Sequence, residues 1–226
     1  MALHALLVGV NHYHPDSTVR PLSGCQNDVN AVKKFLQQHF ADQIPGDSHI
    51  RELVNEQATR ANVIAGFREH LAAAGPGDTA FVYFSGHGAQ NLTAPEFMPF
   101  VTDKKEEGWV LYDSRVPGSF DLADKEIALL LEEVGRRGAD ITVIADSCHS
   151  GSVTRDAEDF MNWKSRFIPG SKEPRPLESY LDGAYKKRLA ETGILAVPYT
   201  RHILYAACDK AEVAWESDEK CGVFTR

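Results

Sequence analysis

Apolar runs as long as typical strands alternate with helix-like patterns along most of the chain. The strand-like runs lie at residues 5–10, 49–54, 79–84, 141–145 and 202–207. Apolar residues recur at helical spacing between them, in residues 28–40, 59–74 and 122–137. After the strand at 79–84 we expect a long loop through about residue 120. This alternation is typical of right-handed βαβ crossovers. We therefore expect an α/β fold, a mostly parallel twisted sheet with helices on both faces (an α/β/α sandwich).

Residues 152–200 interrupt this alternation. The segment contains four prolines and mixes acidic residues with eight basic ones. A connection this long inside a compact domain usually has a function of its own, and a merely solvated insertion is the alternative. We expect a helix at about 177–190. The chain is then one domain, 1–226, with a core at 1–151, an insertion at 152–200 and a final part at 201–226.

Composition narrows the possible partners. The 226 residues carry a formal net charge of −8, so we expect neither nucleic acid nor a membrane surface as a partner. No window approaches 18 consecutive apolar residues, and residues 1–10 are better interpreted as a first strand than as a signal peptide. The four cysteines show no C-x-x-C spacing. We expect a cytoplasmic protein with free thiols.

Two of the predicted strands end in chemically reactive side chains. Residues 141–145 lead into Asp146-Ser-Cys-His-Ser-Gly151, and residues 79–84 lead into Ser85-Gly-His-Gly88. Because parallel strands present their carboxyl ends at one edge of a sheet, Cys148 and His87 are expected to meet there. A thiol beside an imidazole is the pair needed for an activated sulfur nucleophile. The backbone amides of Gly88 and Cys148 are our candidate donors to an oxyanion.

Each motif also has an ordinary interpretation. His87, between two glycines, could be a turn residue, and Cys148 could be a buried thiol beside a surface histidine. A structural zinc site is disfavoured because Cys148 and His149 are adjacent and cannot easily bind the same metal ion. We interpret His149 as a local turn residue. The two motifs together, at the ends of successive strands, favour a catalytic pair.

The two motifs also carry a family resemblance. Tyr83-Phe-Ser-Gly-His-Gly88 together with Asp146-Ser-Cys-His-Ser-Gly151 resembles the caspase-like cysteine peptidases, and most closely the metacaspases and their bacterial relatives, the orthocaspases. Three further segments are similar to parts of that family: Ala5–Asn11 to its first strand, Leu22–Val29 to its L-x-G-C-x-N-D segment, and Tyr205–Glu212 with Gly222–Thr225 to the stretch after its fifth strand.

The resemblance implies a substrate preference. Metacaspases cleave after arginine or lysine with acidic residues in the S1 pocket, and the matching positions here are Asp28 and Asp146, with Ser85 beside them. A pair of carboxylates would bind a guanidinium through bidentate hydrogen bonds. The ordinary alternatives are a stabilising acid in the first turn of a helix for Asp28 and a polar strand end for Asp146.

The implied activity is that of a cysteine endopeptidase with a Cys148–His87 dyad. Such an enzyme hydrolyses peptide bonds after Arg or Lys through a thioester, requires no organic cofactor, acts on proteins or peptides, and is expected to be a monomer. Two alternatives stay open. One is a caspase-fold regulatory module without activity, and the other is a cysteine hydrolase that acts on a non-peptide amide or ester.

Calcium dependence, a property of many metacaspases, is left open by the sequence. Arg155 stands where an aspartate of the family would align. Asp113, Asp121 and Asp124 are available, but Lys125 interrupts a possible pair of acids. Calcium prefers six or more oxygen ligands, which this spacing does not supply.

The insertion occupies the position of the processing linker in caspase-like enzymes. We expect self-cleavage there, with Lys186, Lys187 and Arg188 as candidate positions. We also expect residues 201–226, which end soon after the last predicted strand, to be only the start of a small-subunit-like part.

Overall fold

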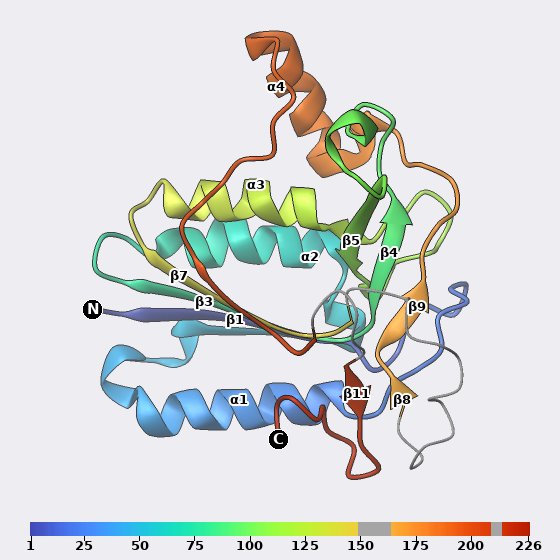
Figure 1. Ribbon diagram of the computed structural model, residues 1–226. Coiled ribbons are helices and arrows are strands. Elements are labelled where there is room, and N and C mark those ends of the chain that lie inside the picture. Colours follow the sequence, from blue (N-terminus) through green and yellow to red (C-terminus); the bar gives the residue numbers. More distant parts are fainter. Residues whose placement is uncertain (149–163, 209–213) are drawn as a thin grey trace.

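A five-stranded parallel sheet forms the centre of the protein in the computed structural model, which describes residues 1–148, 164–208 and 214–226. Its strand order is β10-β7-β3-β1-β2, and every neighbouring pair is parallel. Helices α2 and α3 cover one face and α1 covers the other (Figure 1). The predicted α/β sandwich is confirmed. The strands are β1 Leu3–Gly9, β2 Ile50–Val54, β3 Thr79–Ser85, β7 Asp140–Asp146 and β10 Ile203–Ala206.

Strand β1 shows why the central runs are apolar without interruption. Leu6 and Val8 belong to the core under α2 and α3, whereas Ala5 and Leu7 belong to the core under α1. Successive side chains of a strand point to opposite faces, so a strand covered on both sides needs apolar residues at every position.

The helices follow the predicted pattern with shifted ends. Thr59 caps α2 as predicted, because its hydroxyl accepts a hydrogen bond from the Asn62 amide at 3.2 Å. Helix α2 continues through a π turn at Gly66–His70. Among the described residues, no helix combines the length and apolarity needed to cross a bilayer. The helices are α1 Cys25–His39, α2 Arg60–Ala65, α3 Asp124–Gly135 and α4 Ala184–Thr192.

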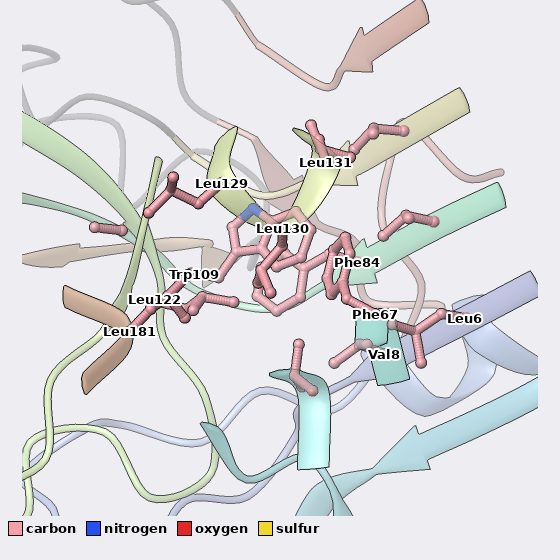
Figure 2. Close-up of a cluster of buried hydrophobic side chains, with 14 of the residues drawn as sticks. Leu6, Val8, Phe67, Phe84, Trp109, Leu122, Leu129, Leu130, Leu131 and Leu181 are labelled. Atoms are coloured by element: carbon pink, nitrogen blue, oxygen red, sulfur yellow. The ribbon is translucent and has the colours of Figure 1, made fainter. Parts of the chain in front are cut away.

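The larger core lies between the sheet and helices α2 and α3 (Figure 2). The rings of Phe84 and Trp109 stack at its centre, with centroids 4.5 Å apart and planes 6° apart. Phe67, Leu130 and the neighbouring buried leucines surround them. Burial of one such side chain stabilises the fold by about 1.5–3 kcal/mol, so this core fixes the strand ends that form the site.

The expectation of a long loop from the third strand to about residue 120 is wrong. That region contains β4 (Gly88–Leu92) and β5 (Lys105–Trp109), which pair antiparallel. A four-stranded sheet of order β6-β5-β4-β9 results, with β6 at Leu122–Ala123 and β9 at Phe167–Pro169. β4 begins directly after His87 and pairs with β9 of the insertion. The small sheet therefore places part of the insertion at the edge where the predicted dyad lies.

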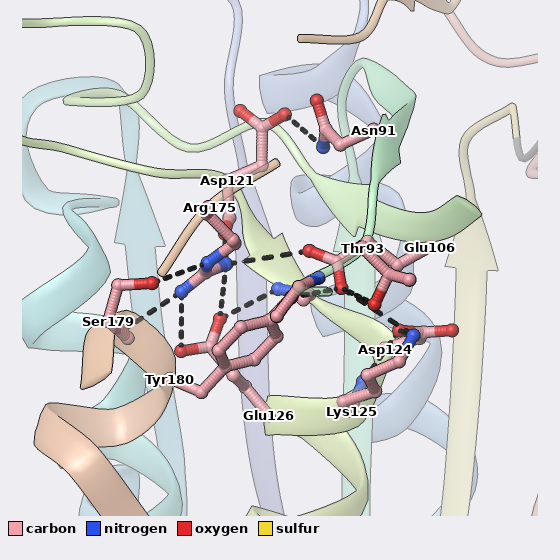
Figure 3. A network of polar contacts seen from close by, with 12 residues as sticks. Asn91, Thr93, Glu106, Asp121, Asp124, Lys125, Glu126, Arg175, Ser179 and Tyr180 are labelled. Atoms are coloured by element: carbon pink, nitrogen blue, oxygen red, sulfur yellow. Dashed lines mark hydrogen bonds and ion pairs between the residues drawn. The ribbon is translucent and has the colours of Figure 1, made fainter. Parts of the chain in front are cut away.

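The described part of the insertion is anchored to the core by buried polar contacts (Figure 3). The buried Arg175 guanidinium donates two hydrogen bonds of 3.1 Å to Glu126 of α3. The Tyr180 hydroxyl donates to Glu106 of β5 at 2.6 Å. The predicted helix at about 177–190 corresponds to 3-10 turns at Leu177–Gly183 followed by α4. A purely solvated insertion is therefore excluded for residues 164–192.

Candidate active site

The sheet register brings the two reactive side chains to one edge. Ser85 of β3 pairs with Asp146 of β7, and His87 and Cys148 each lie two residues beyond that pair. The two strand ends touch at Gly88, where an added Cβ would lie 1.7 Å from the Cys148 carbonyl oxygen. That space admits only glycine, so the backbones of the two motifs are in direct contact.

The buried imidazole of His87 has one nitrogen held and one free. Its Nε2 lies 3.0 Å from the Arg20 carbonyl oxygen, which can only accept, so Nε2 carries the proton in the neutral ring. Nδ1 has no hydrogen-bond partner among the described residues. Burial lowers the pKa of His87 to about 3. The ring is therefore neutral, with the Nδ1 lone pair available to take a proton.

The Cys148 thiol rests away from that lone pair. Its Sγ accepts a hydrogen bond from the Ala214 amide at 3.1 Å and lies 3.3 Å from the Ala214 carbonyl oxygen. Burial, and next the neighbouring Cys208 thiol, raises the pKa of Cys148 well above its ordinary value. Because Nδ1 of His87 is unpartnered, no hydrogen bond joins the dyad here. The arrangement is a resting one, with a neutral thiol and a neutral imidazole.

The predicted pocket residues Asp28, Ser85 and Asp146 converge, and Arg166 of the insertion fills the space between them. All four side chains are buried. The Arg166 Nη2 atom lies 2.7 Å from Asp28 Oδ2, and Nη1 lies 3.0 Å from Asp146 Oδ1. The Ser85 hydroxyl accepts from Arg166 Nη1 at 2.9 Å and donates to Asp28 at 2.8 Å. The pocket thus binds a guanidinium, and the guanidinium belongs to the chain itself.

A third carboxylate, Glu216, was missed from the sequence. Its Oε2 lies 3.6 Å from Arg166 Nη2, and the same carboxylate accepts hydrogen bonds from the amides of Ser23 and Gly24. The one available signal was its position six residues before the segment Gly222–Thr225, which resembles part of the family. We call Asp28, Asp146 and Glu216, with Ser85, the acidic pocket.

The far end of the chain closes the acidic pocket. The Gly222 amide donates to Asp28 Oδ1 at 2.9 Å, and an added Cβ on Gly222 would lie 2.1 Å from Asp146 Oδ2. The Thr225 hydroxyl donates to the same oxygen of Asp146. Burial raises the pKa of Asp146, and the charge of Arg166 opposes that shift. Three carboxylates around one guanidinium leave the buried pocket with an excess of negative charge, which selects a cation.

The backbone of Arg166 is hydrogen-bonded to a neighbouring segment on each side. Its amide donates to the Ala214 carbonyl at 3.0 Å, and its carbonyl accepts from the Gly88 amide at 2.9 Å. On one side β8 (Lys164–Ser165) pairs antiparallel with β11 (Trp215–Glu216), and on the other β9 pairs parallel with β4. Residues 164–169 therefore lie as an extended strand across the site. The Gly88 amide that contacts Arg166 is the one predicted as an oxyanion donor.

The predicted self-cleavage residues lie on α4, and Arg166 takes the acidic pocket instead. Lys186 pairs with the exposed Glu178, and Arg188 donates to Glu132 of α3 at 2.9 Å. Two residues interpreted from the sequence, His149 and Arg155, lie outside the described residues.

The aspartates considered for calcium are already engaged. Asp121 accepts from Arg115 at 2.6 Å, and Asp124 pairs with Lys125 at 3.2 Å. Asp113 accepts from the Arg60 amide. Within residues 1–148, 164–208 and 214–226, no group of three or more His, Cys, Asp or Glu side chains could hold a metal ion. These residues do not fit a calcium site in this arrangement.

Comparison with known proteins finds relatives among the metacaspases. The family profile "Metacaspase, peptidase C14 domain" matches residues 4–156. Metacaspase-7 of Arabidopsis thaliana is 31% identical over 165 residues, which cover 70% of this chain and 37% of that protein. Metacaspase-1A of Aspergillus niger is 28% identical over 154 residues, which cover 66% of this chain and 36% of that protein. The chain thus spans little more than a third of the length of these relatives.

A solved structure supports the fold. The crystal structure of protein GSU0716 from Geobacter sulfurreducens superimposes with a TM-score of 0.64 and 22% sequence identity, covering 100% of this chain and 79% of that one. Since the family profile matches more than half of the chain and includes both strand-end motifs, the chain belongs to the metacaspase family of peptidases.

Proposed function

We propose that this chain is a cysteine endopeptidase that cleaves peptide bonds after arginine, or less readily lysine, with Cys148 as nucleophile and His87 as base. One observation carries the proposal. Arg166 lies in the acidic pocket with its carbonyl oxygen on the Gly88 amide, as the residue before a scissile bond would lie. The strand around it occupies the cleft, so the structure represents a self-blocked form.

The proposed reaction uses the contacts described above. Cys148 transfers its proton to Nδ1 of His87, whose ring is held by the Arg20 carbonyl, and the sulfur attacks the carbonyl carbon of the bound residue. The amides of Gly88 and Cys148 stabilise the oxyanion. The protonated imidazole then donates to the leaving amine. His87 next activates a water molecule, which hydrolyses the thioester.

Arginine is preferred because the pocket accepts hydrogen bonds from both terminal nitrogens of a guanidinium. Nη1 donates to Ser85 and to the Asp146 carbonyl, and Nη2 donates to Asp28. A lysine ammonium is a single point charge and cannot make this divided set of contacts.

Self-cleavage is proposed after Arg166 rather than at Lys186, Lys187 or Arg188. Those three residues lie within α4, where hydrogen bonds of the helix would have to break before a peptide could extend across the cleft. Arg166 is already extended and already holds the pocket. We also propose, as expected from the sequence, that the protein is a cytoplasmic monomer.

The test compares purified wild type with Cys148→Ala. Denaturing mass spectrometry should find wild type cut into two polypeptides, the second with Phe167 at its amino terminus, and Cys148→Ala uncut. Peptides with Arg, Lys or Asp at the cleaved position should be hydrolysed in the order Arg, Lys, Asp. An intact wild type without activity on any peptide would favour the regulatory module. Ester hydrolysis without peptide hydrolysis would favour the non-peptide hydrolase.

A further inference from the structure

A second thiol lies beside the proposed nucleophile. Cys208 follows β10, which pairs with β7, and the pairing extends past the strand because the Ala207 amide donates to the Ala145 carbonyl at 2.9 Å. The Cys208 thiol then donates to the carbonyl of Ser147 at 3.4 Å. Ser147 directly precedes Cys148, and the two cysteines belong to one buried cluster.

The resting Cys148 thiol points toward this neighbour. It contacts the Ala214 backbone, and the Cys208 thiol is close enough to raise the pKa of Cys148, whereas Nδ1 of His87 has no partner among the described residues. The register of β10 and β7, extended past the strands, places Cys208 opposite Ser147, one residue before Cys148. The two cysteine Cα atoms are then one diagonal step apart, about 5.8 Å for strands about 4.8 Å apart with a rise of about 3.3 Å per residue. A disulfide needs about 4.4–6.8 Å between its Cα atoms, a range that includes this spacing.

We propose that Cys148 and Cys208 form a reversible disulfide when a hydroperoxide oxidises the nucleophile, and that this bond switches the peptidase off. The proposal rests on the proposed function, because it takes Cys148 as the catalytic sulfur. It assigns to Cys208 the role of resolving thiol.

The chemistry balances with hydrogen peroxide as the two-electron oxidant. The Cys148 thiolate attacks the peroxide, the O–O bond breaks, and a sulfenic acid and hydroxide form. The Cys208 sulfur then attacks the sulfenic sulfur, its proton leaves with the hydroxyl as water, and the S–S bond forms. In total two thiols lose two electrons and two protons, and one peroxide becomes two waters. Dithiothreitol reverses the bond by two thiol–disulfide exchanges.

The strand that carries Arg166 controls access to this pair. Both thiols are buried in the blocked form, and a buried, protonated thiol reacts slowly with peroxide. When the strand leaves the cleft, Cys148 becomes accessible and His87 can take its proton. Oxidation should therefore affect the active form and spare the blocked one.

Cys221 provides the matched control. It is more exposed than either member of the pair, and its thiol contacts the Ser217 hydroxyl at 3.4 Å. If exposure alone decided reactivity, Cys221 would be the cysteine that peroxide modifies first.

The experiment treats self-cleaved wild type, Cys208→Ser and Cys221→Ser with hydrogen peroxide at neutral pH, followed by tryptic mass spectrometry without reduction. Wild type and Cys221→Ser should yield residues 138–155 linked to residues 202–210, with two hydrogens lost, and their activity on an Arg peptide should fall at least about 10-fold and return with dithiothreitol. Cys208→Ser should yield no linked peptide, and its lost activity should not return, because the sulfenic acid proceeds to sulfinic acid.

Two results would overturn the proposal. One is the absence of the linked peptide in oxidised wild type, and the other is full recovery of oxidised Cys208→Ser with dithiothreitol. If the protein has no peptidase activity at all, the linked peptide still decides whether the pair forms, so failure of the disulfide and failure of the proposed function are separate results.

Discussion

Removal of the arginine that fills the acidic pocket should uncover the nucleophile. Arg166→Ala deletes every contact between the guanidinium and the three carboxylates, while the backbone bonds to Ala214 and Gly88 stay available. The docked strand would then cover a buried pocket that contains unpaired negative charge. Water that enters the vacated space hydrates the buried carboxylates only in part, whereas departure of the strand exposes them to bulk solvent.

The size of the effect follows from the burial of the ion pairs. Removal of one partner of a buried, hydrogen-bonded charge pair costs about 3–5 kcal/mol. Each 1.4 kcal/mol is a factor of ten, so the docked fraction of the strand should fall by about 100-fold to 4000-fold relative to the undocked fraction. When opening and closing are fast, the reactivity of a covered group follows the open population. Cys148 should therefore be alkylated at least about 100-fold faster in the variant.

Alkylation by iodoacetamide in a background that cannot cleave itself measures this directly. We would compare His87→Ala with His87→Ala/Arg166→Ala by peptide mass spectrometry over time, with Cys221 as the internal reference, and confirm by thermal unfolding that both remain folded. Cys148 rates within about twofold of each other, at equal Cys221 rates, would refute the idea that the guanidinium holds the strand in place.

Three further predictions follow from the same site. Glu216→Gln should lower kcat/KM for Arg peptides by about 10-fold or more, because the pocket loses one negative charge near the guanidinium. Glu219→Gln, on the exposed surface, should leave kcat/KM unchanged. Equal values for the two variants would contradict the role of Glu216. Gly88→Ala should reduce kcat by about 100-fold or more, since its Cβ would overlap the Cys148 carbonyl and displace an oxyanion donor, whereas Gly46→Ala, with open space around it, should behave as wild type. Burial lowers the His87 pKa from 6.5 to about 3. Between these pH values the unfolded chain binds a proton that the folded chain does not bind. Acidification below pH 6.5 should therefore lower the free energy of unfolding by up to about 1.4 kcal/mol per pH unit. Urea unfolding at pH 7 and pH 5 would check this, because a steeper loss in wild type than in His87→Asn is expected and parallel losses would argue against it.

The sequence predicted the central sheet and the reactive residues that follow its strands. Strands β1 and β3 have both faces buried, so their residues form apolar runs, and the order of runs and helices fixes which strand ends meet. Cys148 and His87 were identified because each follows such a strand end, whereas Asp28 and Asp146 were identified from the resemblance to the metacaspases.

The sequence did not predict the residues whose positions depend on contacts with distant parts of the chain. Glu216 reaches the acidic pocket from a strand that begins only at Trp215, and no local pattern marks it. Arg166 is one of eight basic residues in the insertion, and only the three-dimensional match to the carboxylates distinguishes it. β4 and β5 were missed because Lys105-Glu-Glu-Gly-Trp109 lacks the alternation of a half-buried strand.

The anchoring of the insertion determines what a cut after Arg166 would leave behind. Residues 167–226 would still hold a strand of the central sheet, two tyrosines in the main core and the buried Arg175–Glu126 pair. The severed piece would therefore remain bound to the first without a covalent link. Ultracentrifugation would detect one particle of unchanged size where a denaturing gel shows two bands. The cut would therefore let the strand leave the cleft while the two pieces stay associated.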